Sequence, residues 1–205
     1  MQKALRSISI GITGCLAIGV SLYAFSYLLV EHGFLQTKTN LNNFQAWNII
    51  FHFHFIGGGI ALFLGWAQFW KWLRNKYFRF HRITGMIYVG AILLASAPAG
   101  IYASFFAIGR FSNDIGFGMM GVLWFIFTFL AFTAIKKKNL SEHINWMIRS
   151  YALTLGAVTL RLWLPILMGL IGLSFDEAYS TVAWLSWVPN LIVAEIVIAK
   201  GWIEA

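Results

Sequence analysis

The sequence predicts an all-α, polytopic integral membrane protein with six transmembrane helices. Three observations lead to this fold class: 60% of the 205 residues are hydrophobic and only 11% are charged, long apolar stretches alternate with short polar gaps, and the basic gaps alternate with gaps that are nearly free of cations. A hydrocarbon core of about 30 Å requires about 20 apolar residues per helix, so six spans use nearly the whole chain. We therefore expect one six-helix transmembrane domain over residues 1–205.

Six apolar stretches mark the expected helices. In chain order they cover residues 8–30, 44–70, 83–108, 116–135, 145–170 and 179–199. The first stretch continues past Cys15 to Val30, which is too long for the apolar part of a signal peptide and predicts an uncleaved anchor. Tryptophans near the span ends suit the headgroup region and prolines in the last two stretches predict kinks; these residues are Trp47, Trp70, Trp72, Trp146, Trp202, Pro165 and Pro189.

The gaps between the stretches decide the orientation. The second and fourth gaps contain the basic clusters Lys71, Arg74, Lys76, Arg79 and Arg82, and Lys136, Lys137 and Lys138. The other gaps contain only Lys38 and Arg110 as cations, whereas Lys3, Arg6 and Lys200 flank the termini. The basic clusters fall on one side if both the N and C termini are cytoplasmic. The basic side chains that give the net charge of +8 are therefore expected to contact the headgroups of the lipid bilayer, and no nucleic-acid partner is expected.

Helices two and three resemble helices four and five in their organisation. Each pair is a hairpin closed by a basic loop, and His81 or His143 opens the outgoing helix. This repeat predicts two hairpins related by a pseudo-twofold axis along the membrane normal. Helices 2–5 would then form a four-helix core, flanked by helices 1 and 6.

Ionisable residues within the bilayer are the candidate functional residues, because a charge in lipid is costly. They are His52, His54, Arg149, Arg161 and Glu195, with His81 and His143 at the inner boundary. His143 and Arg161 are eighteen residues apart, which is five whole helical turns, so we expect them to share a face of helix five with Met147, Ser150, Thr154 and Ala157. Helix two has a similar stripe, which predicts close helix packing or a flat ligand: His54, Gly58, Ala61, Gly65 and Gln68.

His81 and His143 are the candidate ligands of a haem iron. They lie at the same depth on alternate helices of the expected core, and a b-type haem takes one axial imidazole from each side. The alternative is that both are interfacial side chains at helix ends.

His54 and Arg161 form a second candidate site. Both are expected about 22–24 Å from the inner boundary, where they could bind a quinone headgroup or haem propionates, or simply join two helices. Arg149 is a further candidate cofactor-binding residue, although a buried ion pair with Glu195 is the conservative assignment.

Several of these residues belong to longer motifs. They are His54-Phe-Ile-Gly-Gly-Gly-Ile-Ala-Leu-Phe-Leu-Gly65 with Gln68-Phe69, His81-Arg82 with Gly85 and Tyr88, and His143 with Trp146-Met147-Ile148-Arg149-Ser150-Tyr151-Ala152 and Arg161-Leu162. This pattern resembles a bacterial family of predicted membrane proteins, domain of unknown function 2306 (DUF2306). The resemblance covers helices two to five and implies a multi-pass protein of the bacterial cytoplasmic (inner) membrane, without a settled substrate. Trp66-Ala67 departs from the Gly-Pro-Phe-like residues expected there.

Three functions follow from these patterns. The first is electron transfer with haem b or a quinone, which requires a membrane redox partner. The second is a non-catalytic subunit of a membrane complex or a small-solute transporter. The sequence contains no pair of Gly- and Pro-interrupted helices in corresponding halves, which weakens the transporter version but not the subunit version. The third is a metal-dependent membrane enzyme with zinc on His81, His143 and Glu142, but the sequence offers no further ligand to complete the set.

Overall fold

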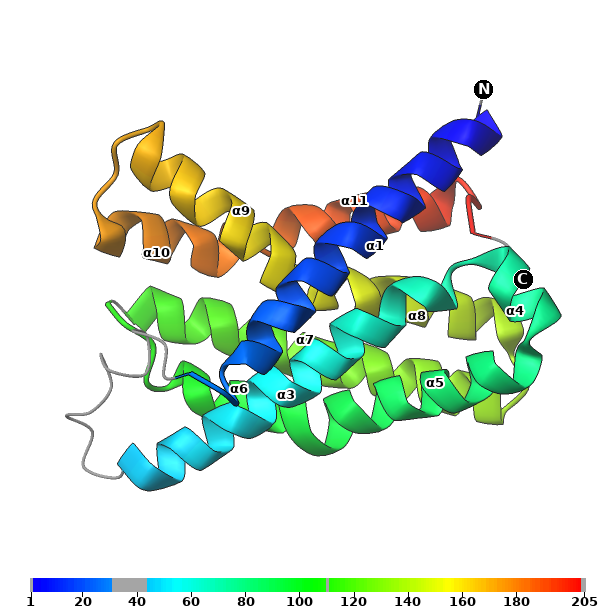
Figure 1. The fold of residues 1–205 in the computed structure, drawn as a ribbon, viewed down its shortest axis with the longest axis horizontal. Helices are drawn as coiled ribbons and strands as arrows, with labels where there is room; N and C mark the ends of the chain where they lie inside the picture. The colour runs from blue at the N-terminus through cyan, green and yellow to red at the C-terminus, as the bar shows by residue number, and fades with distance from the viewer. Residues whose placement is uncertain (1, 31–43, 110, 204–205) are drawn as a thin grey trace. The chain divides into compact units, whose positions relative to one another are not determined.

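A computed structural model describes residues 2–30, 44–109 and 111–203, and every regular element in this part of the chain is a helix. The elements are α1 (Gln2–Ser26), α3 (Phe44–Gln68), α4 (Lys71–Lys76), α5 (Phe78–Ala91), the π-helix η1 (Ile92–Ser96), α6 (Ala97–Ser104), α7 (Phe111–Lys136), α8 (Leu140–Thr154), α9 (Gly156–Gly169), α10 (Phe175–Leu185) and α11 (Val188–Ala199) (Figure 1).

Five helical segments of the described residues are long and apolar enough to cross a membrane. They are Gln45–Gln68, Phe78–Ser104, Phe111–Lys136, Leu140–Gly169 and Phe175–Ala199, and a shorter apolar helix, Gly11–Ser26, precedes them. The predicted fold class, an all-α polytopic membrane protein, is confirmed. Lys38 and Arg110, which entered the prediction of orientation, lie outside the described residues.

The chain forms two compact units, Met1–Ala99 and Gly100–Ala205. In the first unit α3 packs against α1 on one side and against α5 and η1 on another. In the second unit α7 packs against α8 and α10, while α11 packs against α8. Each unit therefore contains one of the two predicted hairpins, and the four-helix core remains a prediction.

A proline accounts for the π-helix in the third span. Pro98 follows η1 by two residues, has no N–H to donate, and would bring its ring against the carbonyl of Leu94 in a regular helix. A widened π turn before the proline relieves this collision. Its last residue, Ser96, is fully buried against α3, and this contact matters for the candidate site.

Helices five and six are both interrupted in the second unit. Pro189 lies in the first turn of α11, directly after the break at Ser186 and Trp187, so the predicted kink at Pro189 is confirmed. Pro165 lies inside α9, and the break in helix five falls at Leu155 instead. The tight turn is closed by a 2.9 Å bond from the Val158 N–H to the Leu155 carbonyl. The kink at Pro165 stays a prediction, and the break at Leu155 was not predicted.

Three of the tryptophans expected in the headgroup region are exposed, and Trp47 is buried. Trp70, Trp72 and Trp202 are 43%, 52% and 53% exposed, as expected at span ends. Trp47 is only 2% exposed and stacks on Phe51 with ring centroids 4.8 Å apart. Trp47 is therefore a core residue, because helical spacing brings it over Phe51 within the apolar interior.

Candidate functional site

His143 is held in one orientation by the neighbouring helix. The Asn139 side chain caps α8 by accepting a 3.2 Å bond from the Glu142 N–H, which fixes the first turn that bears His143. The half-buried imidazole places Nδ1 2.8 Å from the Ala131 carbonyl on α7. A carbonyl only accepts, so Nδ1 carries the proton and donates. Nε2 then carries a lone pair, and it has no hydrogen-bond partner among the described residues.

His54 is anchored in the same way within the first unit. Its Nδ1 lies 2.9 Å from the Ser96 carbonyl, and the Ser96 hydroxyl donates back to the His54 carbonyl at 2.6 Å. The two helices can approach this closely because Gly57 has no side chain: a Cβ there would lie 2.9 Å from the Ala91 carbonyl oxygen. Thus the stripe on helix two packs directly on helix three, and its histidine is part of the contact.

The sequence repeat pairs His81 with His143. Bonds from an imidazole to a carbonyl of another helix are described for His54 and His143. His81 is half-buried near the beginning of α5, with its ring 6.4 Å from that of Phe78. His54 and His81 belong to the first unit, and His143 and Arg161 to the second. The pairings of His81 with His143 and of His54 with Arg161 stay predictions.

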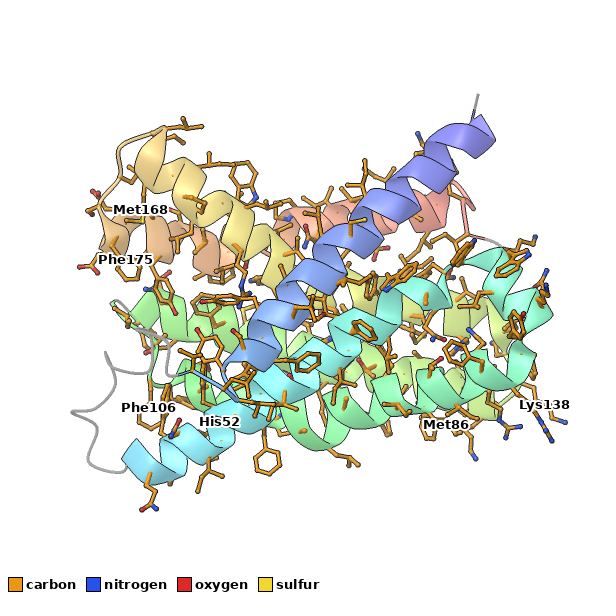
Figure 2. The ribbon with its side chains drawn as sticks, viewed as in Figure 1. His52, Met86, Phe106, Lys138, Met168 and Phe175 are labelled. Atoms are coloured by element: carbon orange, nitrogen blue, oxygen red, sulfur yellow. The ribbon has the colours of Figure 1, made fainter. Side chains whose placement is uncertain are left out.

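His52 differs from His54 although both are on α3, where His52 is labelled in Figure 2. Its Nδ1 lies 2.7 Å from the carbonyl of Asn48, one turn earlier on its own helix. Its ring lies 4.8 Å from that of Phe55. His52 therefore does not join two helices through this bond, which makes it a useful reference for His54.

Arg149 and Glu195 form the ion pair that the sequence predicts. The Arg149 Nε and Nη2 donate to the two carboxylate oxygens at 2.6 and 2.8 Å, a bidentate arrangement that joins α8 to α11. The guanidinium also lies 4.6 Å from the ring centroid of Trp146. The pair is not buried as expected: the exposed fractions of the two side chains are 20% and 54%.

Arg161 does not share a continuous helix with His143. The break at Leu155 separates α8 from α9, so counting five regular turns between the two residues does not hold. The exposed guanidinium of Arg161 donates from Nη1 to the Ala157 carbonyl on its own helix at 2.8 Å. The polar residues of the expected stripe face α7 instead, where Ser150 lies 2.7 Å from Thr128 and Thr154 accepts from Trp124 at 3.0 Å. This stripe is a helix contact.

A polar network at the two helix breaks was missed in the sequence. The Asn190 Nδ2 donates to the Ala152 carbonyl, the Thr159 hydroxyl and the Ser186 carbonyl at 3.1, 3.2 and 3.0 Å. Thr159 also donates to the Ser186 carbonyl. The hydroxyl of Ser186 is buried and has no hydrogen-bond partner among the described residues. A single Asn in an apolar stretch, directly after a proline, was the available signal.

The described residues contain no group of three or more His, Cys, Asp or Glu side chains that could hold a metal ion. A zinc site on His81, His143 and Glu142 therefore gains no support. A haem needs only axial ligands from the protein, so this observation does not bear on it.

These features define a multi-pass, all-α membrane protein whose helix pairs are joined by anchored histidines, an ion pair and buried hydroxyls. The chain belongs to the family described as predicted membrane protein (DUF2306), whose model matches residues 51–198. The resemblance seen in the motifs is thereby confirmed. Neither a curated protein nor a solved structure matches the chain.

The most specific family motif, residues 143–152, lies entirely on α8. Its buried members Met147, Ser150 and Tyr151 fill the interior of the second unit. Its polar groups reach two neighbours: His143 bonds α7 and Arg149 bonds α11. The motif therefore describes one helix that positions a histidine while fixing the helices on either side.

Proposed function

We propose that this protein is a b-type haem-binding electron-transfer component of the bacterial cytoplasmic membrane, with both termini cytoplasmic. The observation that carries the proposal is the 2.8 Å contact between the His143 Nδ1 and the Ala131 carbonyl. Histidines that bind a metal almost always donate their other ring N–H to a carbonyl, carboxylate or water, which fixes the tautomer and makes the ligating nitrogen more basic. The imidazole of His143 has this arrangement and offers Nε2.

His143 and His81 are the residues that would hold the haem iron. Haem would supply one-electron chemistry, and the protein would hold the ring, exclude water and tune its potential through the two imidazoles. His54 and Arg161 are proposed to bind the propionates or a quinone headgroup, because the guanidinium donates hydrogen bonds to oxygen and the Nε2 lone pair of His54 can accept one from a quinol hydroxyl. The anchoring of His54 by Ser96 supports this role, since an imidazole held by a carbonyl presents its other nitrogen in a fixed direction.

Visible spectroscopy tests the haem directly. The detergent-purified protein should show a Soret band and, after reduction with dithionite, a sharp alpha band. His143→Ala should remove both bands, whereas His52→Ala should retain them, because His52 bonds only the carbonyl of its own helix in the hydrogen bonds described. A colourless wild-type protein that contains no extractable haem would overturn the proposal, and so would a His143→Ala variant with an unchanged spectrum.

The broken helices favour a second candidate, a small-solute transporter. The breaks at Leu155 and Ser186 meet at Thr159 and Asn190, and broken helices are a common feature of transporter binding sites. Proteoliposomes can be tested for glycerol and urea permeability by light scattering after an osmotic step. Rates equal to those of empty liposomes would count against transport of these solutes, and Asn190→Ala should lower any rate above that level.

A further inference from the structure

We propose that α4 and the beginning of α5 form a binding surface for the headgroups of anionic phospholipids. The headgroup surface is defined by the cations Lys71, Lys76, Arg79 and Arg82 and the aromatic residues Trp70, Trp72, Tyr77 and Phe78. It connects the spans Gln45–Gln68 and Phe78–Ser104, so it lies at a membrane–water boundary. This inference is independent of haem binding.

The headgroup surface is fully available for contact within its unit. None of the residues of α4 is buried. Trp72 and Phe78 are 52% and 65% exposed, and their neighbours Trp70 and Tyr77 are also exposed. Large exposed aromatic side chains at a span end are typical of the interfacial region, where an apolar ring contacts lipid and its polar edge contacts the headgroup. The rings therefore set the depth of this segment.

Stacked rings order this segment and one of its cations. The ring centroids of Trp70 and Trp72 are 5.5 Å apart, and those of Trp72 and Tyr77 are 5.9 Å apart. The Lys76 Nζ lies 5.1 Å from the Trp72 centroid and 5.6 Å from that of Tyr77. A cation–π contact of this kind holds the ammonium at the level of the rings. Lys76 is therefore positioned beside the aromatic groups that enter the interface.

The charges of the headgroup surface favour an anionic partner. Residues 44–109 contain no Asp or Glu, so this part of the first unit supplies no carboxylate to balance its cations. Arg79 and Arg82 are exposed and one turn apart on α5, which places both guanidinium groups on one side of the helix. A phosphate diester of a lipid fits between such groups and accepts several charge-assisted hydrogen bonds.

A hydrogen bond between the two spans fixes the segment that carries the headgroup surface. The Gln68 Nε2 donates to the Thr84 hydroxyl at 2.8 Å, and that hydroxyl donates to the Phe80 carbonyl at 2.8 Å. Gln68 and Thr84 are buried, so this bond lies in a dry environment. The segment between them is closed at both ends, which reduces the loss of conformational freedom when a lipid binds.

The other basic loop provides a matched control. Lys136, Lys137 and Lys138 follow one another after α7, and Lys138 is labelled in Figure 2. Only one cation–π contact is described there, with the Lys136 Nζ 5.9 Å from the Phe132 ring, and Glu142 follows in the first turn of α8. The control loop therefore has comparable basic charge but lacks the group of exposed tryptophans.

Native mass spectrometry of the full-length protein, titrated with phosphatidylglycerol, tests the proposal. The variant Lys76→Gln/Arg79→Gln/Arg82→Gln should lose affinity about tenfold or more, because each cation near an anionic surface contributes severalfold. The control Lys136→Gln/Lys137→Gln/Lys138→Gln should lose clearly less affinity, because that loop has Glu142 beside it and lacks the exposed tryptophans. Trp72→Leu should weaken binding as well, because it releases Lys76 while keeping an apolar side chain.

Four results would overturn the proposal. One is an unchanged affinity of the first triple variant, and another is an equal loss in the control variant, since general basicity would then explain binding. The third is that phosphatidylcholine binds the wild type as tightly as phosphatidylglycerol. The fourth is that a large excess of inorganic phosphate displaces the lipid. Circular dichroism of each variant, which alters only exposed side chains, separates loss of binding from loss of folding.

Discussion

Gly57 allows the second and third spans to touch, and its replacement by alanine should push them apart. A Cβ at this position would lie 2.9 Å from the Ala91 carbonyl oxygen and 3.0 Å from the Ser96 Cβ. Ordinary van der Waals contact begins at 3.4 Å, so the backbone contact is short by about 0.5 Å. The obstructing atom belongs to the backbone, and a rotamer change in the neighbour cannot relieve it.

The expected cost follows from two opposing effects. Overpacking of a close interface costs about 1–3 kcal/mol, whereas alanine is favoured over glycine in a helix by about 1 kcal/mol. Gly90→Ala isolates the second effect, because a Cβ there meets nothing within 4 Å. Gly57→Ala should therefore be less stable than Gly90→Ala by about 1–3 kcal/mol. The contrast between these two variants does not depend on the absolute stability of the protein.

Unfolding in mixed micelles with increasing sodium dodecyl sulfate, followed by tryptophan fluorescence, gives the free energy of unfolding of both variants. A shift of helix three should also lengthen the 2.9 Å contact between the His54 Nδ1 and the Ser96 carbonyl. If Gly57→Ala is as stable as Gly90→Ala, then the two spans do not make the close contact described, and the anchoring of His54 loses its structural basis.

Substitutions at two further sites, Asn190 and the Arg149–Glu195 pair, test the contacts of the second unit. Asn190→Ala removes three hydrogen bonds at the helix breaks and should lower the free energy of unfolding by about 1–3 kcal/mol, whereas Asn190→Asp should not restore it, because a carboxylate cannot donate to the Ser186 carbonyl. A change below about 0.5 kcal/mol would mean that water satisfies these groups instead. Arg149→Gln and Glu195→Gln should each lower the free energy of unfolding. The loss in the double variant should be smaller than the sum of the two single losses by about 1 kcal/mol, since neither charge is then left alone. Additive losses would show that the two side chains do not interact in the membrane.

The fold class could be predicted because length and polarity alone decide it. A membrane span requires an apolar stretch of set length, and the gaps between stretches are then obvious from their charges. The predicted stretches 44–70 and 116–135 correspond to α3 and α7 within a few residues. Charge complementarity likewise predicted the pairing of Arg149 with Glu195 across two helices.

The interruptions could not be predicted in the same way, because they depend on neighbours that are distant in sequence. Pro98 and Pro189 mark breaks, but Pro165 does not, although all three are prolines in apolar stretches. The break at Leu155 has no proline at all. It lies beside Gly156, where a Cβ would be 2.5 Å from the Met120 methyl group. Gly156 therefore packs closely against Met120 of α7, a neighbour that is distant in sequence and has no local signal.

Sequence and structure point to His143 through different features. Counting turns identified His143 through its depth in the membrane, whereas the structure adds the carbonyl that fixes its tautomer, and a backbone carbonyl has no sequence signal. Because of this contact, the haem proposal also predicts how the reduction potential depends on the Ala131 carbonyl. If His143 ligates iron, its Nδ1 proton bonded to Ala131 should make the imidazole a stronger electron donor and lower the reduction potential. Deleting that proton's acceptor is impossible by side-chain exchange, but Ile135→Pro would press its ring against the Ala131 carbonyl, one turn earlier, and should raise the potential or release the haem. Val122→Pro, at another exposed position of the same helix, acts on the Gly118 carbonyl and should disturb the potential less.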